Sequence, residues 1–210
     1  MAILRSVDEV AAMITAATRP VRRTIVGIVG SPGAGKSTVG EALVARLNTL
    51  SASAQLVSMD GFHLPQSRLV ELGRRDRMGA PDTFDVDGFV ALLEQLPAAT
   101  GTVTAPGFDR DVEEATPGTV SIAHDRRVIV VEGSYLLLDQ GGWQRVAPLL
   151  DLTLFVELER DIRIERLIAR HERYGKSSVD AAAWALGPDE ANAQLIEHTA
   201  ARADHEVRPG

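Results

Sequence analysis

Short apolar runs alternate along the chain with segments of amphipathic pattern. Residues 24–29 (TIVGIV) are apolar at odd and even positions alike, which predicts a strand buried on both faces of a parallel sheet. Further apolar runs at 55–59, 128–131 and 152–156 predict more strands, and residues 36–50 carry one apolar stripe typical of a helix. This alternation predicts an α/β fold with a doubly wound, mostly parallel sheet and helices on both faces.

Three other segments have apolar residues at helical spacing. They are residues 6–18, 160–173 and 188–203, and we expect Gly175 and Gly187 to end helices. We expect a single domain because no low-complexity linker interrupts the pattern.

The regions of that single domain, residues 1–210, differ in composition. The leading helix falls within residues 1–20, and residues 160–178 form a candidate lid region. Residues 65–87 are polar and rich in Arg, Gly and Pro, which is typical of a loop or mobile cap on the substrate side. Ligands of such sheets bind at the carboxyl edge of the strands, so we expect this loop to cover that edge.

The charge balance favours a small ligand. The chain carries 22 Lys and Arg against 29 Asp and Glu, for a net charge of −7, so we expect a small-molecule substrate and no nucleic-acid partner. The absence of cysteine excludes disulfides and thiolate catalysis. No leader and no apolar window long enough for a membrane span is visible, so we expect a cytoplasmic protein without a membrane partner. A homodimer is compatible with the sequence.

Residues 30–37 read GSPGAGKS and match G-x-x-x-x-G-K-[ST] between a predicted strand and a predicted helix. In this motif backbone N–H groups and the helix N-terminus bind phosphate, the lysine bridges the β- and γ-phosphates, and the hydroxyl binds Mg²⁺. The alternative is a glycine-rich turn that joins two elements, but such a turn needs no lysine. The expected nucleotide-binding residues are Gly30, Ser31, Pro32, Gly33, Ala34, Gly35, Lys36, Ser37 and Thr38, with Ser37 also a metal ligand.

A phosphate-binding loop alone does not separate kinases from GTPases, transporter ATPases and motors. The chain has no N-K-x-D string and no L-S-G-G-Q string, which opposes the GTPase and the transporter ATPase. We therefore expect an ATP-dependent kinase that phosphorylates a hydroxyl group of a small metabolite. The alternative is a regulatory ATPase or switch without a small-molecule acceptor.

Two carboxylates follow predicted strands. Asp60 comes after the run that ends at Met59, where it can accept the proton of an acceptor hydroxyl as catalytic base; the alternative is a turn or cap residue. Glu132 ends VIVVEG and can hold Mg²⁺, or else cap a helix. His63 is close enough in sequence to Asp60 to contact a polar group of the acceptor. The alternative is a loop histidine whose ring nitrogens form hydrogen bonds with the backbone.

The segment 160–173 carries arginines along one face of its predicted helix. They are Arg163, Arg166, Arg170 and Arg173. Such a face can neutralise phosphate charge in the transition state, and we favour Arg166 and Arg170 as catalytic residues beside Lys36 and Asp60. The alternative is a solvated face that pairs with neighbouring glutamates.

Other candidate residues are less specific. Asn192 lies on the last predicted helix, where it can contact the acceptor or serve as an exposed or capping residue. Trp143, Trp184 and Tyr135 are expected to be core or interface anchors. No cluster of His with Asp or Glu indicates a transition-metal site, so Mg²⁺ carried with ATP is the only expected ion.

These motifs resemble the phosphoribulokinase, uridine kinase and pantothenate kinase group of P-loop kinases, over about residues 24–203. GSPGAGKST is shared widely, whereas MDGFHLPQ at 59–66, RMGAPDTFD at 77–85 and TAPGFD at 104–109 resemble the pantothenate kinase branch. The overall pattern is also similar to bacterial nucleoside kinase-like or fructose-transport-associated kinase-like proteins.

The resemblance implies a P-loop NTPase fold with an arginine-bearing lid, and ATP and Mg²⁺ as cofactors. It makes Asp60 the catalytic base, Glu132 the metal-side carboxylate and Phe108 a wall of the acceptor pocket. It also aligns Arg170 and Arg173 with lid arginines and places Arg77 on the substrate side. Two positions depart from the family patterns: Arg110 stands where bacterial pantothenate kinases usually have histidine, and Gly79 stands where uridine kinases have a ribose-binding carboxylate. The implied acceptor is pantothenate-, nucleoside- or sugar-like.

Overall fold

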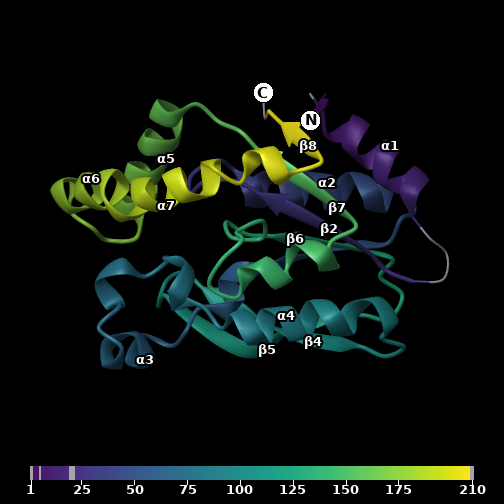
Figure 1. Cartoon of the computed structure of the whole chain (residues 1–210), viewed down its shortest axis with the longest axis horizontal. Helices are drawn as coiled ribbons and strands as arrows, with labels where there is room; N and C mark the ends of the chain where they lie inside the picture. The colour runs from purple at the N-terminus through teal and green to yellow at the C-terminus, as the bar shows by residue number, and fades with distance from the viewer. Residues whose placement is uncertain (1, 5, 19–21, 209–210) are drawn as a thin grey trace.

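A six-stranded parallel sheet forms the centre of the molecule (Figure 1). The computed structural model describes all residues except 1, 5, 19–21 and 209–210. In spatial order the strands are β1 (Ala2–Leu4), β8 (His205–Val207), β7 (Leu152–Val156), β2 (Thr24–Val29), β6 (Val128–Glu132) and β3 (Ala54–Ser58). Every pair of neighbours is parallel. The apolar runs predicted four strands of this sheet, β7, β2, β6 and β3, whereas β1 and β8 were not predicted.

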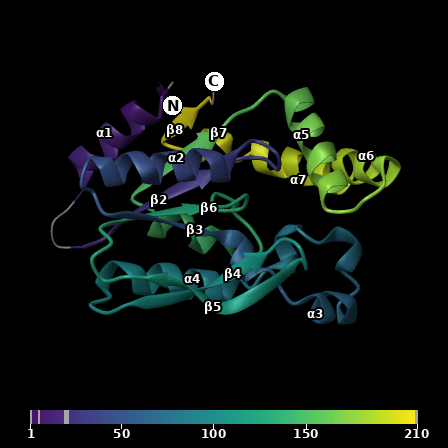
Figure 2. The same cartoon turned by 180° about the vertical axis from the view of Figure 1, so that it is seen from behind.

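The helices are α1 (Val7–Ala17), α2 (Lys36–Thr49), α3 (Gln66–Glu71), α4 (Val86–Gln95), α5 (Arg160–Arg173), α6 (Ser178–Leu186) and α7 (Pro188–Glu197). The four predicted helices are present as α1, α2, α5 and α7, whereas α3, α4 and α6 were not predicted. The predicted helix at 188–203 ends earlier, because a separate 3₁₀ turn, Ala200–Arg202, follows α7. The sheet with helices on both faces confirms the predicted fold class (Figure 2).

Alternate residues of the central strands belong to two apolar cores. Val26 and Ile28 of β2 pack with α1 and α2, whereas Ile25 and Val29 pack on the opposite face with α4. Figure 2 shows α1 and α2 on one side of the sheet and α4 on the other. All four side chains are fully buried, which explains why the run is apolar at every position.

An antiparallel hairpin covers α4 and was not predicted. It consists of β4 (Val103–Asp109) and β5 (Glu114–Ile122). Pro106 and Gly107 interrupt its strand pattern, and the register shifts there. The hairpin packs tightly on the 3₁₀ turn Met59–Phe62, since a Cβ atom on Gly61 would lie 2.1 Å from the Pro106 carbonyl oxygen. The hairpin is therefore docked beside the end of β3.

Residues 65–87 are more ordered than the expected loop. They contain α3 and the 3₁₀ turns Arg75–Arg77 and Pro81–Thr83. Two buried aromatic side chains hold them, because Tyr135 Oη donates to Gly79 O (2.5 Å) and Trp143 Nε1 donates to Pro81 O (3.0 Å). Figure 1 shows α3 at the same end of the molecule as α5 and α6. None of the described helices is both long and apolar enough to cross a membrane.

Candidate active site

A cavity of about 790 Å³ lies at the carboxyl edge of the sheet. It is lined by the loop after β2, by the turn after β3, by the end of β6, by the hairpin and by α5 to α7. Ligands of parallel α/β sheets bind at this edge. The sequence motifs that were separate along the chain therefore meet in one space.

The loop at 30–37 joins β2 to α2 in the predicted way. Gly33 (φ +79°) and Gly35 (φ +94°) adopt left-handed backbone conformations that side chains disfavour. Lys36 Nζ donates to Gly30 O (2.8 Å) and Ser31 O (3.2 Å), and burial lowers the Lys36 pKa, with partial compensation from Glu132. Of the predicted nucleotide-binding residues, the cavity is lined by Pro32, Gly33, Gly35, Lys36, Ser37 and Thr38, whereas Gly30, Ser31 and Ala34 are buried and do not line it.

Asp60 lies in the 3₁₀ turn that follows β3. Its backbone N–H donates to Ser58 Oγ (3.2 Å), which fixes the turn. Arg110 Nη2 donates to Asp60 Oδ2 at 2.7 Å. Burial raises the Asp60 pKa, but the nearby His63 and the positive charges of Arg110 and Lys36 outweigh burial, so the pKa falls below its ordinary value. Asp60 is thus ionised at neutral pH and held in one orientation.

Glu132 is the last residue of β6, and its carboxylate lies within hydrogen-bond distance of two serine hydroxyls. Its Oε1 accepts from Ser58 Oγ (2.6 Å) and from Ser37 Oγ (3.3 Å). Burial raises the Glu132 pKa, and the neighbouring Asp60 charge raises it further. Carboxylate and hydroxyl oxygens such as these are the ligands that Mg²⁺ prefers. Among the described residues no group of three or more His, Cys, Asp and Glu could hold a metal ion.

The cavity has aromatic walls beside Asp60. His63 lies between Phe84 and Phe108, with ring centroids 4.0 and 4.8 Å away. His63 Nδ1 lies 2.8 Å from Asp60 O, and because a carbonyl only accepts, Nδ1 carries the proton. Burial lowers the His63 pKa, so the ring is neutral. The structure therefore brings His63, Phe108 and Arg110 to the same part of the cavity as Asp60.

The expectation for Arg77 requires correction. Its guanidinium donates to both Asp82 carboxylate oxygens (2.5 and 2.7 Å) and does not line the cavity. The nearby Arg75 lines it instead and donates to Glu113 Oε2 (2.8 Å). The short turn Arg75–Arg77 directs the two side chains differently, which the sequence pattern did not reveal. Asn192 does line the cavity and donates to Gly79 O (3.4 Å).

The arginines of α5 separate into two kinds. Arg166, Arg170 and Arg173 line the cavity, and no described carboxylate forms a salt bridge with them. Arg163 is 1% exposed and binds the loop backbone and α7 instead. The expected single basic face is thus wrong for Arg163, because α5 packs against the loop at that point.

Some lining residues were missed in the sequence. His171 of α5 and Asp189 of α7 form a 2.7 Å pair within the cavity wall. Trp184 of α6, expected to be an anchor, also lines the cavity, where Lys176 lies over its ring. No motif signals these residues, since they come together only when α5, α6 and α7 pack.

The model of the phosphoribulokinase / uridine kinase family matches residues 25–207 of this chain. A crystal structure of a putative fructose transport system kinase from Silicibacter sp. TM1040 superposes with a TM-score of 0.90 at 34% identity, covering 96% of this chain and 98% of that one. The ATP-dependent kinase-like protein notR' of Aspergillus versicolor is 40% identical over 56% of this chain and 73% of its own. The uncharacterized protein YggC of Escherichia coli (strain K12) is 32% identical over 84% of this chain and 74% of its own. Proteins named pantothenate kinase and uridine kinase are also similar to this chain.

Proposed function

Because the chain belongs to the phosphoribulokinase / uridine kinase family and is thus an ATP-dependent phosphotransferase, we propose that it phosphorylates a hydroxyl group of a small metabolite. The acceptor is pantothenate-, nucleoside- or sugar-like. Relatives named pantothenate kinase, uridine kinase and fructose transport system kinase support this range. Each of these names describes a kinase, and together they span several acceptor types.

One observation carries the proposal: Lys36 and Ser37 of the loop line the same cavity as the Asp60 carboxylate. A triphosphate in the loop places its terminal phosphorus near Lys36. The cavity volume of about 790 Å³ leaves room for an alcohol beside the nucleotide phosphates. Phosphoryl transfer depends mainly on such in-line positioning and on charge stabilisation.

Asp60 is proposed as the catalytic base. With Oδ2 held by Arg110, Oδ1 has no partner among the described residues and can accept the proton of an acceptor hydroxyl. Its lowered pKa keeps it ionised, although it also makes the carboxylate a weak base. A weak base suffices in a loose transition state, where the hydroxyl proton leaves late and orientation of the oxygen matters more.

Lys36, Arg166 and Arg170 are proposed to stabilise the charge of the transferred phosphoryl group. All three line the cavity, and the two arginines form no salt bridge with a described carboxylate. Ser37 and Glu132 would hold Mg²⁺, which neutralises phosphate charge when bound. The two guanidiniums and the Lys36 ammonium would supply the remaining positive charge around the transferred group.

The alternative of a regulatory ATPase needs no acceptor pocket. The Asp60, His63 and Phe108 side chains around the far end of the cavity have no role under that alternative. An acceptor screen separates the two functions. ADP release from ATP and Mg²⁺ would be measured with pantothenate, uridine, nicotinamide riboside, D-fructose and D-ribose. At least one acceptor should stimulate ADP release and become phosphorylated, whereas slow hydrolysis that no alcohol changes would reject the kinase proposal.

A further inference from the structure

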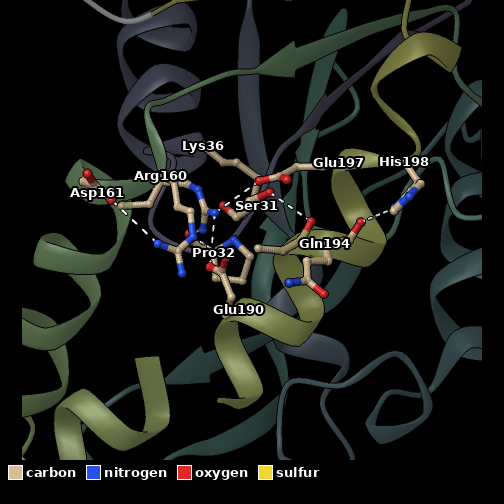
Figure 3. A network of polar contacts seen from close by, with 11 residues as sticks. Ser31, Pro32, Lys36, Arg160, Asp161, Glu190, Gln194, Glu197 and His198 are labelled. Carbon is tan, nitrogen blue, oxygen red and sulfur yellow. Dashed lines mark hydrogen bonds and ion pairs between the residues drawn. The ribbon is translucent and has the colours of Figure 1, made fainter. Parts of the chain in front are cut away.

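The guanidinium of Arg163 is buried between the phosphate-binding loop and α7. Its Nη1 donates to Pro32 O at 3.2 Å. Its Nη2 lies 3.1 Å from Glu197 Oε1 and 3.5 Å from Glu190 Oε2, and both glutamates belong to α7. Figure 3 shows Pro32, Glu190 and Glu197 in one polar network. Arg163 is therefore held by two carboxylates while it binds one carbonyl group of the loop.

We infer that Arg163 is a positioning residue that fixes the peptide plane between Pro32 and Gly33. The carbonyl and N–H groups of a trans peptide point in opposite directions, and no described peptide bond is cis. Since Pro32 O points toward Arg163, the Gly33 N–H points away from it, and Gly33 itself lines the cavity. No described backbone or side-chain group accepts from that N–H. The donor is thus left for a phosphate oxygen.

Glycine at position 33 makes such a constraint necessary. Its φ of +79° belongs to a region that glycine enters and leaves at little steric cost, so the preceding peptide plane can rotate. A rotated plane would turn the Pro32 carbonyl oxygen toward the phosphates and replace an attractive donor with a repulsive acceptor. Glycine is also required by the packing of α5, because a Cβ atom would lie 2.8 Å from Arg163 O. The arginine supplies the orientation that glycine alone does not.

The two glutamates of α7 stabilise the buried guanidinium of Arg163, since an unpaired buried charge is strongly destabilising. The loop contacts α7 a second time, where Ser31 Oγ donates to Ala193 O (3.5 Å). Arg160 pairs with Glu190 as well (2.6 Å), but its side chain is more than half exposed and forms no hydrogen bond with the described residues of the loop. Arg160 is therefore a matched control for Arg163.

The inference rests on the proposed position of ATP phosphates in the loop, but its test needs no acceptor. Three proteins would be compared: the wild-type enzyme, Arg163→Met and Arg160→Met. The affinity of each for ADP and for adenosine would be measured by calorimetric titration and by competition binding. We expect Arg163→Met to weaken ADP binding about tenfold, equal to about 1.4 kcal/mol, and to leave adenosine binding unchanged. Arg160→Met should bind both ligands within about twofold of wild type.

Two results would overturn the inference: a folded Arg163→Met enzyme that binds ADP like wild type, or an equal loss of ADP and adenosine binding, which indicates a general structural role. Thermal melting would establish whether the variant folds. If Arg163→Met does not fold, the variant R163M/E190Q/E197Q removes the uncompensated carboxylates together with the arginine. The same selective loss of ADP affinity is expected, and normal ADP affinity in this variant would equally contradict the inference. A failed acceptor screen would leave this ADP measurement unaffected, so the two proposals fail separately.

Discussion

Arg110 Nη2 donates to Asp60 Oδ2 at 2.7 Å, although 50 positions separate the two residues in the sequence. Asp60 follows a strand of the parallel sheet, whereas Arg110 follows the first strand of the hairpin. Docking of the hairpin on the turn Met59–Phe62 brings them together. The hairpin therefore orients the carboxylate that we propose as the base, and it does so from outside the P-loop core.

Replacement of Asp60 by Asn should separate binding from transfer. Asn cannot accept the hydroxyl proton as a carboxylate does, so we expect kcat to fall about 10²- to 10⁴-fold. ADP affinity should stay within about twofold, because the loop at 30–37 is unchanged. Steady-state kinetics and calorimetric titration measure the two quantities. An equal loss of both would indicate that Asp60 has a structural role.

Removal of the Arg110 charge should alter the pH dependence of transfer. The Asp60 pKa is raised by burial and lowered by His63, Arg110 and Lys36, and the lowering outweighs the effect of burial. Arg110→Met removes one lowering charge, so the Asp60 pKa should rise. Since the proposed base acts when deprotonated, the acidic limb of the profile of kcat/KM against pH should move to higher pH. Arg68→Met, at an exposed pair on α3, serves as control. An acidic limb that stays in place, or moves to lower pH, would contradict this assignment.

Glu132→Gln should stabilise the ligand-free protein while it impairs the metal site. The Glu132 pKa is raised by burial and by Asp60, so the folded state holds this proton more tightly than the unfolded state does. Glu132 therefore contributes to the stability of the fold below the ordinary carboxyl pKa. This contribution is lost as the pH rises through the pKa that Glu132 has in the folded state.

Glutamine mimics the protonated carboxyl at every pH. The variant should therefore melt at a higher temperature than wild type at pH 8, with a smaller difference near pH 4. Thermal melting at both pH values checks the sign, with the exposed Glu94→Gln on α4 as control. A lower melting temperature at pH 8 would show that the ionised form of Glu132 stabilises the fold. Transfer by Glu132→Gln should also require more Mg²⁺ than transfer by wild type.

Arg166→Met and Arg170→Met should each lower kcat. Both guanidiniums line the cavity, and we propose that they face charge that develops on the phosphoryl group. Loss of one such donor typically costs about 10²- to 10³-fold in kcat. The exposed Arg160→Met on the same helix should retain near-normal kcat. If all three variants behaved alike, α5 would influence transfer only through its stability.

The sheet and its helices could be predicted because their signals are local. The apolar run at 24–29 and the stripe at 36–50 coincide with β2 and, within one residue, with α2. The hairpin was missed because Pro106 and Gly107 break its strand pattern, and its stability depends on packing against Gly61. Tertiary contacts, not local propensity, form this element.

The site was predictable where a motif dictates chemistry. The residues Lys36, Ser37, Asp60 and Glu132 line one cavity, as the motifs and strand ends indicated. The roles of arginines could not be assigned from spacing, because Arg163 and Arg166 lie one turn apart on α5 and only packing against Pro32 buries the first. Likewise, Arg75 and Arg77 differ only in the direction that a short turn gives each side chain.

A crystal structure of the enzyme with Mg²⁺ and a non-hydrolysable ATP analogue tests the central claim most directly. We expect the triphosphate in the loop at 30–37, its terminal phosphorus beside Lys36, and open space for an alcohol oxygen between that phosphorus and Asp60. A terminal phosphate that points away from Asp60, or an Asp60 carboxylate closed off by packed side chains, would contradict the account.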